Sequence, residues 1–191
     1  MTGHSEAELV ELEQRLKQLQ LMLQKRKIEQ WRRRVSFGDL ISERADNASL
    51  YGFGKDTTCY DNVLVLGDVK VGRNCWIGPN VILDGCGGLT IGDHVTVSAG
   101  VQIYTHDTVE RTITLGASPM ALASTTIGSG VYLGPNTIVQ MGVTIGDRAV
   151  IGCMSLVNRH IPSRARAWGI PARIVSGESS IPSDKQRGQR A

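Results

Sequence analysis

Aliphatic residues recur every six positions through the second half of the chain, and this spacing constrains the fold more than any other feature of the sequence. Neither an α-helix nor an alternating β-strand has a six-residue period. The uninterrupted anchors of this run are Ile127, Leu133, Val139, Ile145, Ile151 and Val157. The same register holds over residues 65–83 and again over residues 91–103. Two additional residues near positions 85–88 separate these earlier blocks, and we interpret them as a local bulge.

The residues around each anchor indicate how one repeat folds. Glycine directly follows four of the later anchors, at Gly128, Gly134, Gly146 and Gly152. Because glycine adopts positive φ with least strain, we predict a turn immediately after each anchor. Each repeat then forms one short strand and one corner, and three repeats make one coil of a stack with a shared aliphatic core. The sequence therefore predicts a parallel β-helix, since a sandwich would need turns about every 8–12 residues and alternating faces.

Composition excludes several other classes of protein. The chain has 191 residues, of which 41% are hydrophobic and 20% are charged, so it can bury one core. A formal net charge of +3 is too balanced for bulk attraction to a polyanion, and we expect no nucleic-acid partner. The polar start has neither the basic region nor the apolar run of a secretory signal, which favours a cytoplasmic location. The four cysteines lack metal-type spacing and are expected to be reduced thiols.

The N-terminal region has a helical period instead. Ser5 and Glu8 have the spacing of a capping box, and Leu9, Leu12, Leu16, Leu19 and Leu23 follow at steps of three and four. We predict an amphipathic helix over residues 5–34 that forms a short coiled coil or packs on the β-helix or on a neighbour's helix. Six basic residues and Trp31 close this segment. They form either a solvated helix end or a contact with an anionic membrane surface or an acidic partner.

These patterns divide the chain into four parts. Residues 1–35 hold the N-terminal helix, residues 36–60 are a connecting segment, and residues 61–175 form the β-helix domain. The tail from 176 to 191 is rich in Ser, Gly, Gln and charge, and we expect it to be mobile. The six-residue rhythm also fails between Ile103 and Ile127, with a loop expected at about 107–125. This interval is a multiple of six, so either an additional coil or an extruded loop fits it.

His106 lies where the rhythm fails, followed directly by Asp107. A loop that leaves a rigid scaffold is a reasonable place for a functional site. The residues alone leave two interpretations open, a structural His–Asp pair or a site that moves protons. Imidazole suits the second because its unperturbed pKa of about 6.5 lies near neutral pH.

Several segments resemble the hexapeptide-repeat acyltransferases. These are VGRNCWIGPNVILDG, TIGDHVTVSAGVQIYTHD, TIGSGVYLGPNTIVQMGVTIGDRAVIG and the closing GIPARIV, within residues 61–175. The likeness is greatest to the sugar O-acetyltransferase branch, which includes maltose and galactoside acetyltransferases and polysaccharide-modifying relatives. The resemblance implies a left-handed coil, a homotrimer and acetyl-CoA bound between neighbouring subunits.

The resemblance also implies roles for individual residues. His106 matches the catalytic base at the end of the family's Y-T-x-H strand, and Asp107 is a candidate to orient its ring. Asp84 resembles the acidic residue that holds acceptor hydroxyls in galactoside enzymes, although a turn-forming role fits equally, and Tyr104 is placed beside the acceptor. Thr108 stands where polysaccharide-modifying relatives often carry a second histidine, so the acceptor contacts differ from theirs.

A second set of residues is implied to bind the cofactor. The matching positions for coenzyme A are Tyr132, Gly134, Gly152, Cys153, Asn158, Arg159 and Arg173. Arg164 and Arg166 extend the basic stretch in which Arg159 and Arg173 lie. No metal is expected, because His94 and His160 lack the close spacing of the zinc ligands in related left-handed β-helices.

The prediction is therefore an acetyl-CoA-dependent O-acetyltransferase of a sugar or glycan precursor. In this mechanism the acceptor oxygen attacks the acetyl carbonyl directly, and His106 removes its proton. Two alternatives remain at this stage. One is N-acetylation of an amino sugar or small amine, and the other is a non-catalytic β-helix that serves as an assembly or adaptor module.

Overall fold

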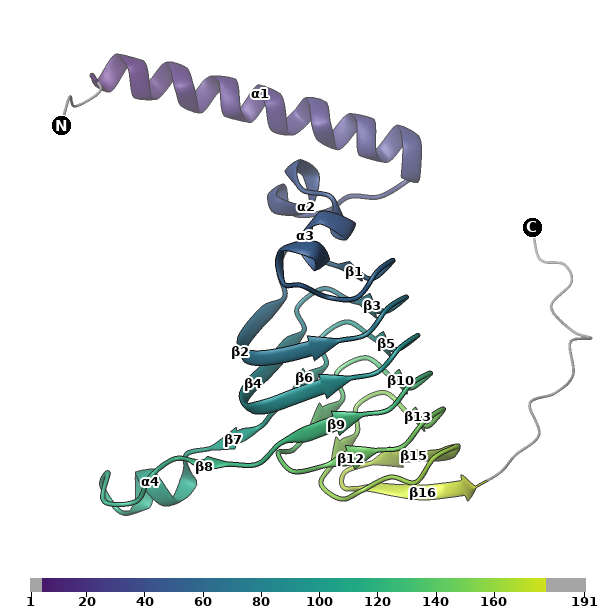
Figure 1. The fold of residues 1–191 in the computed structure, drawn as a ribbon. Helices are drawn as coiled ribbons and strands as arrows, with labels where there is room; N and C mark the ends of the chain where they lie inside the picture. Colours follow the sequence, from purple (N-terminus) through teal and green to yellow (C-terminus); the bar gives the residue numbers. More distant parts are fainter. Residues whose placement is uncertain (1–4, 178–191) are drawn as a thin grey trace, which may run out of the picture.

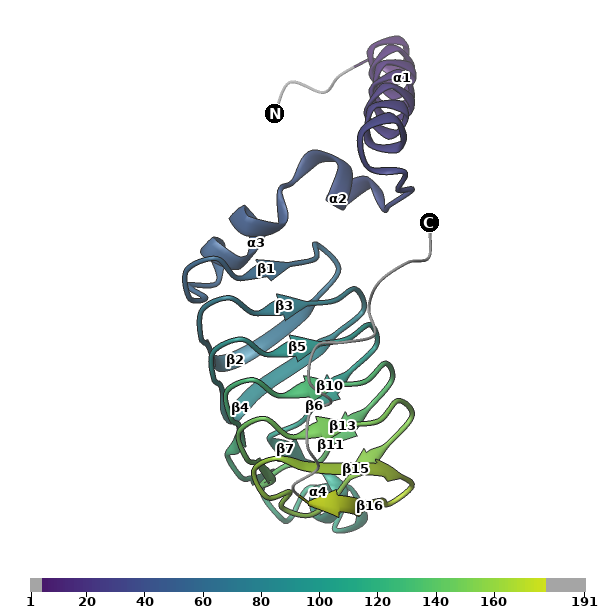
Figure 2. The same cartoon turned by 90° about the vertical axis from the view of Figure 1, so that its right-hand side faces the viewer.

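A computed structural model describes residues 5–177, and the chain there forms a triangular stack of coils with helices at one end (Figure 1). The N-terminal helices are α1 (Glu6–Trp31), α2 (Phe37–Ile41) and α3 (Arg44–Leu50). The stack below them is the predicted left-handed parallel β-helix, which is confirmed. Figure 2 shows its strands lying one above another along the axis.

Face one of the stack is a single sheet. From the N-terminal end its strands are β1 (Thr58–Cys59), β3 (Trp76–Ile77), β5 (Thr96–Val97), β10 (Tyr132–Leu133), β13 (Val150–Ile151) and β15 (Ala165–Gly169). All of these pairs are parallel. The antiparallel strand β16 (Ala172–Gly177) then pairs with β15 and ends the sheet.

Two long strands, β2 (Leu64–Val71) and β4 (Ile82–Ile91), run along face two and bend into face three. Face two continues with β6 (Gln102–Ile103), β11 (Ile138–Val139) and β14 (Leu156–Val157). Face three continues with β9 (Thr125–Ile127) and β12 (Thr144–Ile145), and a bridge joins Ile145 to Ile161. We call the edges between these faces the first corner (one to two), the second corner (two to three) and the third corner (three to one).

The six-residue anchors point inward and form the core. Ile77, Leu83, Leu133 and Ile145 are completely buried, whereas Val65, in the first coil, is partly buried. Residues four positions after an anchor are buried too, including the polar Thr137 and Ser155. Their hydroxyls donate to the carbonyl of Gly152 at 3.0 and 2.8 Å, so the narrow interior contains no unsatisfied hydroxyl there.

The predicted turn chemistry was wrong in its position. The glycines that follow anchors do not have positive φ, and the left-handed residue is instead the third after the anchor, as at Asn80, Asn136 and Arg148. The glycine directly after the anchor is required for a different reason, which is the close approach of the next coil. A Cβ on Gly134 would lie 2.5 Å from the backbone nitrogen of Cys153 in the next coil. Close stacking of the coils therefore selects glycine at this position.

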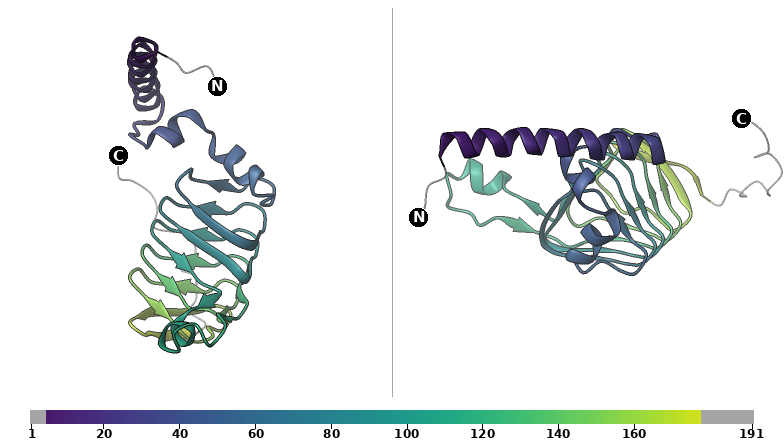
Figure 3. Two further views of the ribbon diagram at one scale, coloured as in Figure 1. Left: turned by 90° about the vertical axis from the view of Figure 1, so that its left-hand side faces the viewer. Right: turned by 90° about the horizontal axis from the view of Figure 1, so that it is seen from above.

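Both breaks in the rhythm have a structural counterpart. The predicted bulge is present, since the register between β2 and β4 shifts after Gly67 and Gly85. After Ile103 the chain leaves the stack as an extruded loop and not as an additional coil. Pairing of Ile91 with Ile127 shows that β9 completes the same coil. The loop contains β7 (His106–Asp107), α4 (Val109–Ile113) and β8 (Ala121–Leu122), and Figure 3 shows it projecting beyond the triangular stack.

Helix α1 begins with the predicted capping box of Ser5 and Glu8. It ends at Trp31, before the predicted Arg34, because Arg32 adopts the left-handed conformation and its N–H bonds to the carbonyl of Ile28. Residues 178–191 of the predicted tail lie outside the described residues. Within residues 5–177, no helix combines the length and the apolar character that crossing a bilayer requires.

Candidate active site

The two breaks in the rhythm meet at the second corner. Leu83 pairs with Ile103, so the bulge after Leu83 lies directly beside the point where the loop leaves after Ile103. The N–H of Gly87 in the bulge donates to the hydroxyl of Thr105 at 2.8 Å. One deformation of the coil therefore supports the other, and His106 lies between them.

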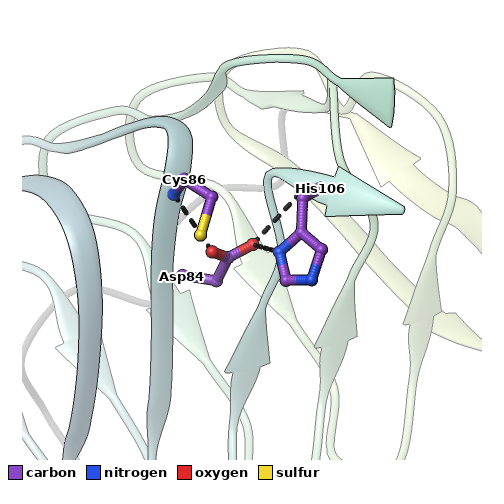
Figure 4. A group of neighbouring side chains, drawn as sticks. All are labelled: Asp84, Cys86 and His106. Atoms are coloured by element: carbon purple, nitrogen blue, oxygen red, sulfur yellow. Dashed lines mark hydrogen bonds and ion pairs between the residues drawn. The ribbon is translucent and has the colours of Figure 1, made fainter. Parts of the chain in front are cut away.

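Asp84 is the centre of this arrangement (Figure 4). Its carboxylate is completely buried, and Oδ2 accepts hydrogen bonds from the N–H of Thr105 at 2.7 Å and that of His106 at 3.1 Å. The same oxygen lies 2.7 Å from Nδ1 of the His106 ring. Oδ1 accepts from the N–H of Cys86 at 3.0 Å. The side chain is thus fixed by donors from both deformed segments.

The hydrogen bonds determine the charge of this group. Burial raises the pKa of Asp84, but the hydrogen bonds from Cys86, Thr105 and His106 outweigh it and hold the pKa well below its usual range. Conversely, the hydrogen bond to Asp84 and burial raise the pKa of the Cys86 thiol. Asp84 is therefore ionised at neutral pH and Cys86 is a protonated thiol that donates to it.

An ionised Asp84 also assigns the tautomer of His106. A carboxylate can only accept, so the proton lies on Nδ1 and the lone pair on Nε2. The imidazole side chain is 26% exposed, and Figure 4 shows Nε2 turned away from Asp84. The arrangement can therefore accept a proton at Nε2 and stabilise the resulting imidazolium through a buried negative charge.

Two expectations for the neighbouring residues are corrected by this geometry. The residue that orients the ring is Asp84 and not Asp107, whose Oδ1 accepts at 2.5 Å from the N–H of Val109, the first residue of α4. Asp84 is not free to hold an acceptor, because it is buried and its oxygens are occupied. Its bond to the N–H of Cys86, two residues on, agrees with the turn-forming interpretation. Tyr104 lies edge-on to the imidazole at 6.4 Å between ring centroids. Its hydroxyl donates to Gln102.

Asp84, Cys86 and His106 could also be considered as metal ligands, since their donor atoms lie within 4.8 Å of one another. A metal at this point would have to displace the Nδ1–Oδ2 bond and the thiol proton. Hydrogen bonding accounts for all three side chains as they stand. His94 and His160 are elsewhere, one exposed at the third corner and the other accepting from the N–H of Thr144.

The residues predicted to bind the cofactor fall into two groups on either side of face two. Asn158 and Arg159 follow Val157 and are exposed at the second corner, the same corner as His106. Gly134, Gly152 and Cys153 lie at the first corner, with Tyr132 beside them on face one. Arg173 is exposed on β16, opposite Trp168.

The arginines expected in one basic patch are separated by the coils. Arg159 lies at the second corner and Arg164 at the third. Arg166 projects from face one in register with Val150. The patch expected from their closeness in sequence is therefore not formed as one surface, because consecutive repeats face different sides of a triangular stack.

Sequence reasoning missed two contributors to the site, Thr105 and Cys86. Thr105 is buried, and its hydroxyl donates to the carbonyl of Asp84 at 2.8 Å. The available signal was the insertion at 85–88 itself, which lies one coil before the loop exit in the same column of the stack.

Comparisons with known proteins agree with this fold. The family model for the bacterial transferase hexapeptide (six repeats) matches residues 124–159, and the hexapeptide repeat of succinyl-transferase matches residues 68–105. The bifunctional protein GlmU of Geotalea uraniireducens is 44% identical over 59 residues, which cover 29% of this chain and 12% of that protein. The chain thus spans about an eighth of the length of this curated relative.

Solved structures extend the likeness over more of the chain. A hexapeptide-repeat-containing acetyltransferase from Vibrio cholerae, complexed with acetyl coenzyme A, is 25% identical with a TM-score of 0.64 and 94% coverage of both chains. AntD, an N-acyltransferase from Bacillus cereus complexed with dTDP and 3-hydroxybutyryl-CoA, is 21% identical with a TM-score of 0.60. That match covers 66% of this chain and 72% of AntD and concerns the fold.

Proposed function

We propose that this protein, whose repeats are those of the hexapeptide-repeat transferases, is an acyltransferase that moves an acetyl group from acetyl-CoA to a hydroxyl of a sugar or glycan precursor. His106 is the general base. The single observation that carries this proposal is the 2.7 Å bond between Nδ1 of His106 and a buried, ionised Asp84, which leaves Nε2 free of that carboxylate.

The reaction follows from this pair. Nε2 takes the proton of the acceptor hydroxyl while its oxygen attacks the acetyl carbonyl, and Asp84 stabilises the imidazolium that forms. When the C–S bond breaks, the imidazolium returns the proton to the sulfur of coenzyme A. The transfer is direct, and no acetyl group is held on the protein. Cys86 is excluded as an acyl carrier because its raised pKa keeps it a thiol.

A hydroxyl acceptor is favoured over an amine by the presence of a built base. A neutral amine is nucleophilic by itself, whereas a hydroxyl near neutral pH depends on proton removal. Transfer to an amino sugar is the second candidate, and AntD, described as an N-acyltransferase, is the neighbour that favours it. A non-catalytic adaptor would gain nothing from an ionised carboxylate buried against a partly exposed imidazole.

Coenzyme A is proposed to contact residues at both edges of face two. Asn158 and Arg159 lie at the same corner as His106, and an arginine there can meet a phosphate. The first-corner residues Gly152 and Cys153 and the nearby Tyr132 line the opposite edge in this arrangement. The Vibrio cholerae relative complexed with acetyl coenzyme A supports this cofactor.

The active unit is proposed to be a homotrimer, for which the outer surfaces of the faces give a physical reason. The residue before each anchor points outward, and on face three these are the polar Lys70, Thr90, Thr126 and Thr144. On face two they are Leu64, Ile82, Ile138 and Leu156 with one polar residue, Gln102, whereas face one mixes Trp76, Tyr132 and Val150 with Thr58, Thr96 and Arg166. Such apolar surface favours contact between subunits. A neighbour against face two would stand beside His106.

The test is release of coenzyme A thiol from acetyl-CoA in the presence of a panel of sugars and amino sugars. His106→Ala is expected to reduce turnover by about 10²- to 10⁴-fold while coenzyme A binding, measured by calorimetry, is retained. His94→Ala, a substitution at an exposed corner histidine, serves as the matched control. Unchanged turnover in His106→Ala would exclude the mechanism, and preference for amines over hydroxyls would support the second candidate.

A further inference from the structure

Helix α1 carries a leucine stripe, Leu9, Leu12, Leu16 and Leu19, that nothing in the described chain covers, whereas Leu23 at its C-terminal end is partly buried. None of the residues of α1 is fully buried, and Leu9 and Leu12 are each 52% exposed. Leu16 and Leu19, on the same face, are 45% and 39% exposed. Figures 1 and 2 show most of α1 standing clear of the coils, beyond the N-terminal end of the stack.

The contacts of α1 with the remainder of the described chain lie near its C-terminal end. The side chain of Gln24 bonds to the carbonyl of Arg33 and the N–H of Val35, and Lys27 lies 3.9 Å from Glu43. The preceding residues, about five turns of helix, project without such support. Isolated helices in water are marginal, and in proteins most helical stability comes from packing an apolar face. The stripe therefore requires a partner.

The charges along α1 point to the direction of that partner. Within α1, residues 6–14 contain four glutamates and neither lysine nor arginine, whereas residues 15–31 contain five basic residues and one glutamate. A helix with one acidic and one basic half is complementary to an antiparallel copy of itself. In a parallel pair the four glutamates of each chain would face one another and repel. An anionic membrane would repel the half that carries Leu9 and Leu12.

We infer that α1 is a self-association helix, and that its leucine stripe pairs antiparallel with α1 of a second copy of this chain. Steps of three and four between leucines are the spacing of a two-stranded seam. An antiparallel pair is isologous, so the same surface serves both copies and the assembly closes. Because α1 lies beyond β1, at the opposite end of the stack from β16, pairing leaves the second corner with His106 open.

The number of chains follows if the proposed trimer is correct, and this step rests on the proposed function. A trimer presents three copies of α1, and helices that pair two by two cannot be satisfied within it. Two trimers joined through their N-terminal ends pair all six helices. The expected assembly is therefore a hexamer built from two trimers.

The experiment is sedimentation equilibrium of the full chain and of two matched double variants. Leu16→Glu with Leu19→Glu places two charges on the stripe, and Gln14→Glu with Gln18→Glu adds the same charge away from it. We expect six chains for the native protein and the glutamine-site control, and three for the leucine variant. Thiol release from acetyl-CoA should persist in the leucine variant. If the assemblies of the native protein and of the leucine variant contain the same number of chains, the inference is overturned. A native dimer that becomes a monomer would support α1 pairing and exclude the trimer.

A third double variant tests the direction of pairing. Glu6→Gln with Glu13→Gln removes acidic charge from the N-terminal half, and the antiparallel arrangement predicts weaker association, by several-fold in the dissociation constant at low salt. Tighter association would indicate a parallel pair and would overturn the proposed arrangement. Glu110→Gln, in the distant loop, is the control for a general effect of net charge.

Discussion

Replacing Asp84 by asparagine is the most informative single change, because it removes a charge and keeps the shape. In the native site, one oxygen accepts from the N–H groups of Thr105 and His106 and faces the imidazole, while the other accepts from Cys86. An amide can keep its oxygen toward the first three donors. Its NH₂ group must then face the N–H and thiol of Cys86, which are also donors.

The expected loss of stability follows from that mismatch. One buried donor left without an acceptor destabilises by about 1–3 kcal/mol, and the remaining bonds lose the charge assistance that made them roughly twice as strong. We expect a decrease of about 2–4 kcal/mol in the free energy of unfolding, or roughly 5–15 °C in the melting temperature for a domain of this size. The fold should survive, since the core anchors are untouched.

The expected loss of activity has a different origin. The amide oxygen still accepts the Nδ1 proton, so the ring keeps its tautomer, but the imidazolium formed during transfer loses its negative partner. We expect kcat for thiol release to fall by about 10²- to 10⁴-fold. Binding of coenzyme A should be unchanged. Asp93→Asn provides the control, because Asp93 also accepts a backbone N–H at a corner, from Arg73 at 3.0 Å, away from His106. Native kcat in Asp84→Asn at a temperature where it is folded would refute the role given to this carboxylate.

Three further predictions concern the surrounding structure. Asp107→Ala should change kcat a few-fold at most, because the carboxylate of Asp107 bonds to the first N–H of α4 and does not hold the imidazole. Steady-state kinetics of this variant and of Asp84→Asn will separate the roles of the two aspartates. At the third corner, Gly146→Ala should destabilise the protein by about 1–3 kcal/mol, because the added Cβ would meet the backbone of Ser163. Arg148→Gly should stabilise the protein by up to about 1 kcal/mol, because it removes a side chain from a residue with a φ of +57°. Denaturant unfolding measures both changes. The pKa of Asp84 in the folded protein lies below its unfolded value of about 3.9. The stabilising contribution of the Asp84 carboxylate is therefore present above about pH 3.9 and is lost as the pH falls below it. The difference in unfolding free energy between the native protein and Asp84→Asn should accordingly shrink below about pH 4.

The fold could be predicted from the sequence because each coil repeats one physical requirement. Leu133, Ile151 and the other anchors must fill a narrow interior at a fixed interval, so their spacing records the winding directly. The turn chemistry could not be predicted in the same way. Gly134 and Asn136 both suggest turns, but one is required by the closeness of the next coil and the other by positive φ. Distinguishing these causes requires the distance between coils, which no residue in the repeat encodes.

The candidate site was predictable in part for a related reason. His106 could be selected because it interrupts a regular pattern, but Asp84 precedes it by 22 positions and its partnership depends on which repeats share a corner. Adjacent residues were misleading, since Asp107 is next to His106 in the chain and its carboxylate turns to Val109. The closeness of Arg159, Arg164 and Arg166 in sequence was likewise misleading. They do not form one basic patch, because consecutive repeats belong to different faces.

A regular solenoid presents nearly the same surface at every coil, so a unique site requires a departure from regularity. Two departures occur here, the bulge after Asp84 and the loop that begins beyond Thr105, and either alone would leave backbone groups without partners at its corner. Together they satisfy each other, because the hydroxyl of Thr105 accepts from the bulge while the carboxylate of Asp84 accepts from the loop. The imidazole of His106 makes a further hydrogen bond to that carboxylate. On this argument, deletion of two residues from the bulge would restore the six-residue rhythm of β4 and abolish the site while leaving the core intact.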